Sequence, residues 1–254
     1  MSTLSKRLIM AIINENHQRI SSAPWFNTML SRSVLIAGLG GIGSNVAYSL
    51  SRLGLNKVYL MDDDTVTTSN INGQLYSFKD VNKKKVNALK DFLNAYSSQS
   101  VFALPQRFTS TTNYAWFNYL DAIITGFDNM TARKDAYYKF KYLIKGSKLP
   151  ILFIDGRMNA EEFQVICLSS LPEDEYRFEK YEKDYLFDDK DAEPTVCSFK
   201  QTSFVSQMIG GVITNLFVNF FSNVISLNDD IFIPRSVPFI TEYSADSMIL
   251  SSKD

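Results

Sequence analysis

The stretch SVLIAGLGGIGSNVAYSL, residues 33–50, constrains the fold of this chain more than any other part of it. Residues 34–37 are apolar and partly β-branched, which is typical of a buried parallel strand, and residues 44–53 have the apolar spacing of a helix. The turn between them contains Gly38, Gly40, Gly41 and Gly43. Glycine lets the backbone approach an anion closely, and a helix N-terminus directs its N–H groups at that anion. The stretch predicts a nucleotide-binding α/β domain without naming the nucleotide.

Length and charge limit the classes of protein to consider. The chain has 254 residues and a formal net charge of −1, so one large α/β domain is expected, with no nucleic-acid partner and no membrane partner. The first 18 residues lack the long apolar core and cleavage site of a signal peptide. The two cysteines, Cys167 and Cys197, form no CxxC motif, so we expect no zinc and a cytoplasmic location.

One apolar segment, FVSQMIGGVITNLFVNFFSNVISL at residues 204–227, has the length of a membrane span. It contains Gln207, Asn215 and Asn219. Amide side chains are costly inside a bilayer, so the segment is predicted to be a buried core helix or a subunit-interface helix.

Strand and helix patterns alternate along most of the chain. Strands are expected at residues 57–61, 101–104, 121–126 and 150–155, with helices between them. Later, residues 162–168 alternate like an antiparallel strand, residues 174–191 form a charged, exposed excursion, and residues 237–250 form a hairpin that closes the sheet edge. We predict a Rossmann-like, doubly wound, mostly parallel sheet with antiparallel strands added in the C-terminal third. An N-terminal helix and loop (1–30) precede one domain (31–254), with a less regular insertion at 158–203 and a late helix and closing strands at 204–254.

Acidic residues and lysines follow the glycine helix at suggestive positions. Asp62 ends the second strand, about twenty residues after the glycines, where an acid accepts hydrogen bonds from ribose hydroxyls. For Asp63 and Asp64, roles as turn or capping residues are equally open. Lysines at 83–85 open a helix, where cations oppose the dipole. They indicate an anion nearby, or else a solvated run of charge.

Four motifs, in this order, carry a family resemblance: GLGGIGS, DDDTVTTSNINGQ, DVNKKKV, and TGFDN followed by Arg133. They resemble the ThiF/MoeB/HesA superfamily of adenylating enzymes, which are related to ubiquitin-activating enzymes. The resemblance covers residues 31–165 and continues more weakly through 194–216, where PTVCS precedes the apolar helix.

This resemblance implies an ATP-dependent adenylyltransferase that uses Mg²⁺. The carboxylate it activates would be the C-terminus of a small ubiquitin-like or sulfur-carrier protein or peptide, and the enzyme would be a homodimer. The four glycines would form the nucleotide loop, and Asp62 would hold the ribose. The other nucleotide-site positions that it implies are Asp64, Asn70 at the triphosphate, Gln74, Lys85 neutralising phosphate charge, Asp128 holding magnesium, and Asn129 and Arg133 supporting that site.

Two further residues have open roles. Cys197 is a candidate acyl acceptor that would form a thioester, and the alternative is a small buried residue. Arg19 corresponds to an N-terminal arginine that reaches the site from a partner subunit, and the alternative is a solvated surface side chain.

The chain departs from the family pattern at Gly73, which stands where an arginine is usual. A phosphate-clamping arginine is worth about three to five powers of ten in rate. Either another cation (Lys83, Lys84 or Arg19) replaces it, or catalysis is weakened. The alternative function is therefore a nucleotide-binding or scaffold protein with weak or no catalysis.

Adenylation also suits these residue types chemically. A carboxylate is already ionised at neutral pH, so the reaction needs no general base and depends on positioning and positive charge. A nicotinamide-linked oxidoreductase, the third class considered, needs neither a lysine cluster nor a magnesium-binding acid. The set of residues therefore favours ATP.

Overall fold

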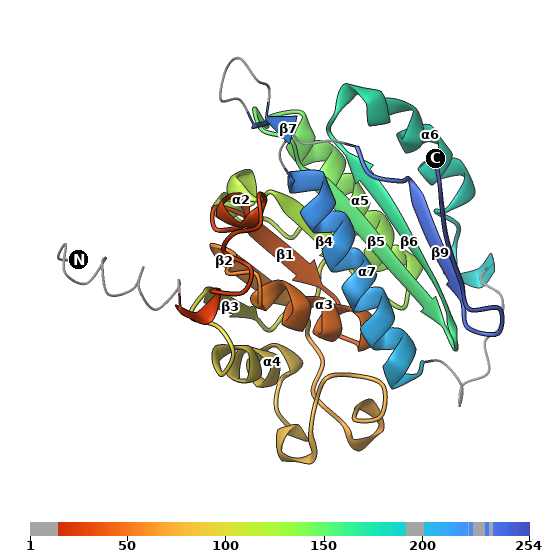
Figure 1. Cartoon of the computed structure of the whole chain (residues 1–254). Helices are drawn as coiled ribbons and strands as arrows, with labels where there is room; N and C mark the ends of the chain where they lie inside the picture. The colour runs from red at the N-terminus through yellow and green to blue at the C-terminus, as the bar shows by residue number, and fades with distance from the viewer. Residues whose placement is uncertain (1–14, 192–200, 223, 226–231, 234–235) are drawn as a thin grey trace.

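The computed structural model describes residues 15–191, 201–222, 224–225, 232–233 and 236–254. Its centre is an eight-stranded sheet in the order β10-β9-β6-β5-β4-β1-β2-β3 (Figure 1). The strands are β1 (Ser33–Ala37), β2 (Lys57–Met61), β3 (Ser100–Leu104), β4 (Ala122–Thr125), β5 (Leu152–Asn159), β6 (Glu162–Ser169), β9 (Ile240–Ser244) and β10 (Ile249–Lys253). A separate pair joins β7 (Val224–Ile225) and β8 (Phe232–Ile233).

Helices cover both faces of this sheet. One face carries α2 (Phe26–Met29), α3 (Gly41–Ser51), α4 (Lys85–Asn94) and α7 (Ser203–Phe221), and the other carries α5 (Met130–Ile144) and α6 (Glu175–Asp184). Short 3₁₀ turns complete the described chain: η1 (Thr68–Asn70), η2 (Phe78–Asp80), η3 (Ala115–Tyr119), η4 (Pro172–Asp174) and η5 (Asp189–Asp191).

The core consists of two apolar clusters, one on each side of the sheet. Successive side chains of a strand point to opposite faces, so Val34 and Ile36 of β1 join the α3–α4–α7 side, while Leu35 and Ala37 join the α5–α6 side. All five residues of β1 are buried, as expected for a parallel strand covered on both faces.

The parallel pairing brings four strand ends to one edge. Ala37 of β1 is in register with Met61 of β2 and with Thr125 of β4, and Thr125 is in register with Asp155 of β5. The turns that follow β1, β2 and β4 therefore lie side by side, next to the part of β5 that continues past Asp155. From β1 the strand order runs to β2 and β3 on one side, and β4 and β5 lie on the other side. Open α/β sheets bind ligands at such a change in strand order, here between β1 and β4.

The C-terminal third adds antiparallel strands, as predicted. β5 continues past the end of β4 and turns back into β6, and β9 pairs with β6 before the β9–β10 hairpin closes the edge. The fold class predicted from the sequence is confirmed: a mostly parallel α/β sheet with antiparallel strands at its C-terminal end.

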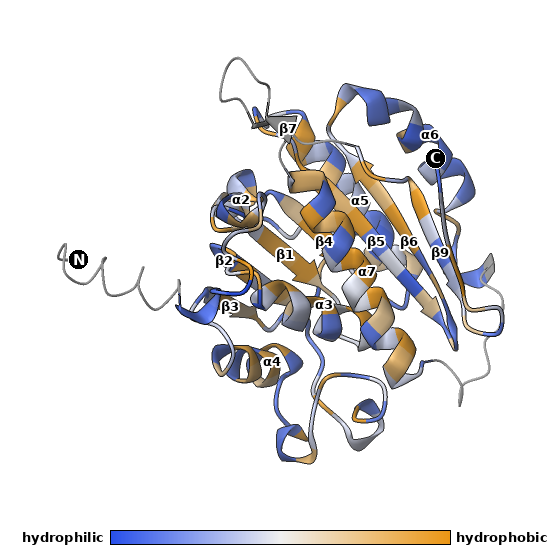
Figure 2. Cartoon of the chain, in the orientation of Figure 1, coloured by the Kyte–Doolittle hydropathy of each residue, from blue (hydrophilic) through white to orange (hydrophobic). Residues whose placement is uncertain are grey.

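The apolar helix α7 packs along α3 and the sheet. Gly210 allows the two helices to approach, because a Cβ at this residue would lie 2.8 Å from the Cβ of Asn45. Within the described residues, α7 is the one helix long and apolar enough to cross a membrane, and half of its most apolar window is buried inside the protein. Figure 2 shows this hydrophobic helix lying across the sheet.

The segment after β6 differs from the exposed excursion expected there. It contains α6, whose Arg177 and Tyr181 are buried against the sheet, with Tyr181 packed on Tyr137 and Phe153. The charged residues that dominate its composition lie on the outer face, which Figure 2 shows as hydrophilic. Most of the segment is exposed, as expected, but the sequence did not predict this helix or the burial of its inner face, because few inward-facing residues recur at helical spacing within a charged sequence.

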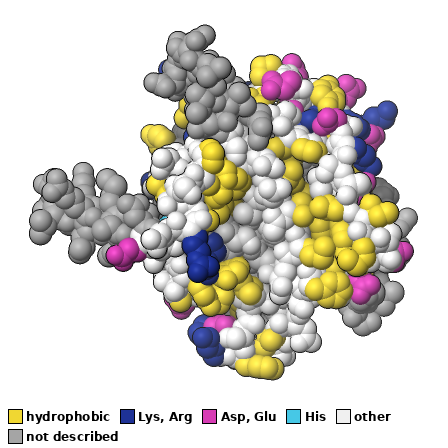
Figure 3. Space-filling model, in the orientation of Figure 1, with side chains coloured by type: hydrophobic (Ala, Val, Ile, Leu, Met, Phe, Trp, Pro, Cys, Tyr) yellow, Lys and Arg dark blue, Asp and Glu magenta, His cyan; other side chains and the backbone are white. Residues whose placement is uncertain are grey.

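Hydrophobic side chains also reach the surface. Figure 3 shows them gathered on the right of the view, over the strands at the C-terminal end of the sheet. Exposed large hydrophobic residues in the described chain include Phe204 and Met208 of α7 and Met248, Ile249 and Leu250 of the final hairpin. The helix predicted at the start of the chain lies almost entirely outside the described residues.

Candidate active site

A cavity of about 620 Å³ opens at the edge where the parallel strands end. Its walls include the turns after β1, β2 and β4, the last residues of β5, the start of α4, and Gln201. The predicted site residues that line it are Gly38, Gly40, Gly41, Asp62, Asp64, Gln74, Lys85, Asp128, Asn129 and Arg133. The side chains expected at opposite ends of a bound nucleotide therefore share one cavity.

The glycine turn depends on two close backbone approaches. Gly38 has a φ of +82°, and a Cβ there would lie 2.9 Å from the carbonyl of Gly126. A Cβ at Gly43 would lie 1.9 Å from the carbonyl oxygen of Gly38, so Gly43 lets α3 start directly beneath the turn without lining the cavity itself. No side chain in the described part of the chain caps the N-terminus of α3. Its first N–H groups therefore remain available to an anion.

Asp62 joins the end of β2 to the glycine turn. Its Oδ2 accepts a hydrogen bond from the Leu39 N–H at 2.6 Å, and its Oδ1 accepts one from the Asp64 N–H at 2.8 Å. Burial raises the pKa of Asp62 above its usual value of 3.8, although these hydrogen bonds and the charge of Lys85 oppose the rise. The two hydrogen bonds fix the orientation of the carboxyl group at the edge of the cavity.

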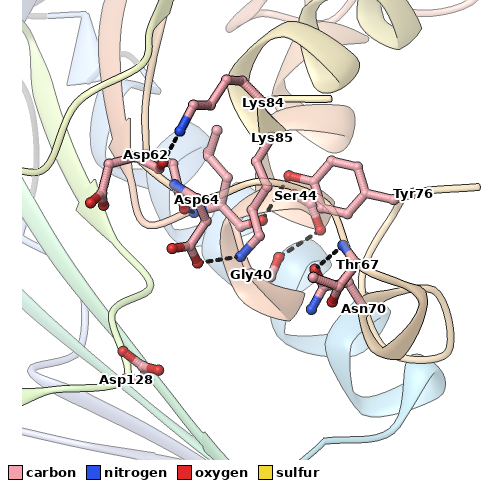
Figure 4. Close-up of polar contacts among 12 residues, drawn as sticks. Gly40, Ser44, Asp62, Asp64, Thr67, Asn70, Tyr76, Lys84, Lys85 and Asp128 are labelled. Carbon is pink, nitrogen blue, oxygen red and sulfur yellow. Dashed lines mark hydrogen bonds and ion pairs between the residues drawn. The ribbon is translucent and has the colours of Figure 1, made fainter. Parts of the chain in front are cut away.

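The lysine cluster separates into one cavity residue and two others. Lys85 begins α4, is buried, and donates a hydrogen bond from Nζ to Asp64 Oδ2 at 2.8 Å (Figure 4). Lys84 Nζ donates to the Asp63 carbonyl at 2.6 Å, and Lys83 pairs with Asp80. Only Lys85 of the three lines the cavity. Its partner Asp64 is exposed, so solvent weakens the ion pair between them. An anion that enters the cavity could therefore take the place of Asp64 at the lysine.

Asp128 follows β4 and lies apart from the Lys85–Asp64 pair, as Figure 4 shows. Its carboxylate is exposed in the cavity, with the Asn129 Nδ2 at 3.3 Å. Asn129 caps α5 by accepting the Ala132 N–H at 2.9 Å, and the buried Arg133 donates to the carbonyls of Phe127 and Gly156. These two residues hold the turn that presents Asp128.

A buried ionic network supports the β5 side of the cavity. Asp155, which is completely buried, pairs with Arg133 and with Arg157, whose Nε donates to Asp155 Oδ2 at 2.8 Å. The Tyr181 hydroxyl donates to the same carboxylate at 3.0 Å. Burial alone would raise the pKa of Asp155, but the two arginines hold it below its usual value of 3.8.

Sequence reasoning missed several residues of the cavity. Arg157 lies in β5, two residues past the strand end predicted at Asp155, and the run Asp155-Gly-Arg was a usable signal. Asp189 accepts hydrogen bonds from the Met130 N–H at 2.6 Å and the Thr131 hydroxyl at 2.9 Å, and nothing in its charged surroundings distinguished it. Arg107 and Gln201 also line the cavity.

Other predicted site residues lie elsewhere. Asn70 accepts the Thr67 N–H at 2.9 Å and caps η1, outside the cavity lining. Arg19 is exposed and does not line the cavity of its own chain. Cys197 lies outside the described residues. Cys167 is buried in β6, where burial raises the pKa of its thiol to about 12.

Two places offer carboxylates to a cation. Oxygen atoms of Asp62, Asp63 and Asp64 lie within 4.8 Å of one another, but Asp62 already accepts two N–H groups and Asp64 holds Lys85. Asp128 is exposed in the cavity with only an amide beside it among the described residues. Mg²⁺ usually takes one or two carboxylates and completes its shell with phosphate oxygens and water, so Asp128 fits this ion better.

The model of the ThiF family matches residues 12–229. The chain is 32% identical over 106 residues to a tRNA threonylcarbamoyladenosine dehydratase of Bacillus subtilis (strain 168), covering 41% of this chain and 42% of that protein. It is 31% identical over 109 residues to the sulfur carrier protein ThiS adenylyltransferase of Escherichia coli (strain K12), covering 42% of this chain and 43% of that protein. The matched segment is thus less than half the length of these curated relatives.

Two solved structures share the fold. One, titled SeMet PaaA, has a TM-score of 0.67 at 20% identity and covers 100% of this chain and 74% of that one. The other, Escherichia coli MccB with ATP, has a TM-score of 0.62 at 17% identity and covers 91% and 66%. At these identities the likeness concerns the fold alone.

Proposed function

The chain belongs to the ThiF family, and on this premise we propose that it uses ATP to adenylate the C-terminal carboxylate of a small ubiquitin-like or sulfur-carrier protein or of a peptide. One observation carries the proposal: the open N-terminus of α3, the buried Lys85 and the exposed Asp128 line a single cavity. Two similarities support it. The chain is similar in sequence to the sulfur carrier protein ThiS adenylyltransferase, and it shares its fold with MccB, whose crystal structure contains ATP.

The nucleotide would lie along the strand ends. Its ribose would meet Asp62, and its phosphates would face the first turn of α3, where N–H groups and the helix dipole favour an anion. Its base would lie toward Met61 and Phe108, which also line the cavity. Lys85 would exchange Asp64 for phosphate oxygens.

Bound at Asp128, Mg²⁺ would neutralise phosphate charge as diphosphate leaves. The chain itself then has two tasks. It must bring a carboxylate to the α-phosphate against the repulsion of two anions, and it must hold both in line. Arg157, which also lines the cavity, would contribute positive charge for an entering carboxylate, and no general base would be required.

Cys197 remains the proposed acceptor for a subsequent acyl transfer. A cytoplasmic homodimer, with Arg19 of one subunit reaching the other subunit's cavity, also belongs to this proposal. An alternative, favoured by the glycine at residue 73, is that the chain binds ATP but turns it over weakly or not at all.

ATP–pyrophosphate exchange tests the proposal. We expect exchange that needs magnesium and a carboxylate partner captured in the presence of ATP, and a loss of at least about a hundredfold with Asp128→Ala, which removes the candidate magnesium ligand. Asp91→Ala, an exposed acid on α4, is the control and should leave exchange unchanged.

The outcomes separate the candidate functions. Unchanged exchange in Asp128→Ala would remove this residue from the mechanism. Binding of ATP without exchange, with every partner tested, would favour the alternative. A preference for NAD over ATP in a binding titration would contradict both.

A further inference from the structure

Gln201 lies beside the glycine turn although it comes from a distant part of the sequence. It precedes α7 and forms a parallel bridge with Ala160, in the turn between β5 and β6. A Cβ at Gly73 would lie 2.7 Å from Gln201 Cγ and 3.0 Å from its Nε2, and a Cβ at Gly41 would lie 2.5 Å from its Oε1. The Gln201 side chain therefore occupies the space that a side chain at residue 73 would enter.

The polar end of this side chain faces the cavity. Gln201 lines the cavity together with Gly40 and Gly41, which begin α3. No hydrogen bond joins the Gln201 amide to any residue that the structure describes. The adjacent Gln74 Oε1 is buried and also has no partner in the described chain. A buried acceptor without a partner, next to the N-terminus of α3, needs an explanation, and a polar ligand in the cavity would supply one.

We propose that Gln201 binds the phosphate groups of the nucleotide, in the place that a side chain at residue 73 would otherwise take. This inference rests on the function proposed above. Its Nε2 would donate a hydrogen bond to a phosphate oxygen and add one donor to the N–H groups of α3. An amide brings no positive charge, so charge neutralisation stays with Lys85 and the magnesium ion.

The packing has a consequence for residue 73. An arginine introduced there has to displace Gln201, because its Cβ alone would overlap the glutamine. Gly73→Arg by itself is thus not a simple restoration of the usual family residue.

The first test compares binding of MgATP, MgADP and adenosine by calorimetry in the full chain and in Gln201→Glu. This substitution keeps the shape and replaces a donor with an anion. We expect ATP affinity to fall about tenfold or more, ADP affinity to fall less, and adenosine affinity to change less than twofold. Gln18→Glu adds the same charge at an exposed position outside the cavity and should change none of them.

The outcomes distinguish this inference from the proposed function. ATP binding that is intact in Gln201→Glu would overturn the inference and leave the function standing. An equal loss for ATP and adenosine would show a packing role and would also overturn it. A parent chain that binds no ATP would overturn both.

A second test needs no nucleotide. Gly73→Ala should lower the melting temperature of the parent chain but change it little in Gln201→Ala, where the overlapping atoms are gone. Gly146→Ala, at a glycine with open space around it, is the control. Equal effects of Gly73→Ala in both backgrounds would contradict the packing from which the inference starts.

Discussion

Asp155 is the residue on which the walls of the cavity most depend. It is fully buried, and its carboxylate joins Arg133 under the Asp128 turn to Arg157 on β5. Removing one partner of a buried ion pair leaves an uncompensated charge, which costs far more than the pair itself contributes. The network therefore couples the stability of the domain to the geometry of the site.

Asp155→Asn should lower the free energy of unfolding at pH 7 by about 3 kcal/mol, because two arginines lose their counter-charge. The folded state holds the pKa of Asp155 below 3.8, so its ionised form contributes stability above that pH. This contribution is lost as the pH falls through 3.8 toward the lower folded value. Urea unfolding at pH 7 and below pH 4 measures this effect. The difference in free energy of unfolding between the variant and the parent should be smaller below pH 4 than at pH 7.

Asp91→Asn, at an exposed position, provides the control and should stay within about 0.5 kcal/mol of the parent. A stability difference for Asp155→Asn that remained constant on acidification would contradict the assignment of an ionised, stabilising carboxylate.

At the scale of elements, the sequence predicted the bounds of a strand or helix well where its apolar residues and turn residues are contiguous in the chain. The strand at residues 57–61 has the predicted bounds, and β1 and β4 differ from prediction by one residue at one or both ends. The helix α6 was not predicted because few of its residues face the core. The predicted strand at residues 150–155 ends four residues before β5 does, because most of the last residues of β5 are not apolar.

The contact between α3 and α7 could not be predicted, since it joins distant segments through Gly210. Gly210→Val should separate the two helices and lower the melting temperature by several degrees. Gly211→Val, at the next residue, has open space around its Cα and is the matched control for loss of backbone freedom. Equal melting temperatures for the two variants would contradict close packing at this crossing.

At the scale of the whole molecule, the site is an assembly of strand ends. Its glycines, Asp62, Lys85 and Asp128 were predictable because ordered motifs place them after successive parallel strands. Asp189 and Gln201 were not, because they join the cavity only through the segments around α6 and α7, whereas Arg157 comes two residues after the predicted strand end at Asp155. Asn70 and Arg19 remain predictions for a nucleotide-bound or dimeric state.

The most direct measurement is a crystal structure of the chain with magnesium and a non-hydrolysable ATP analogue. We expect phosphate density over the first turn of α3. Lys85 Nζ should have turned from Asp64 to a phosphate oxygen, and the metal ion should lie beside Asp128. An analogue bound outside this cavity, or phosphates that leave Lys85 on Asp64 and Asp128 in solvent, would contradict it.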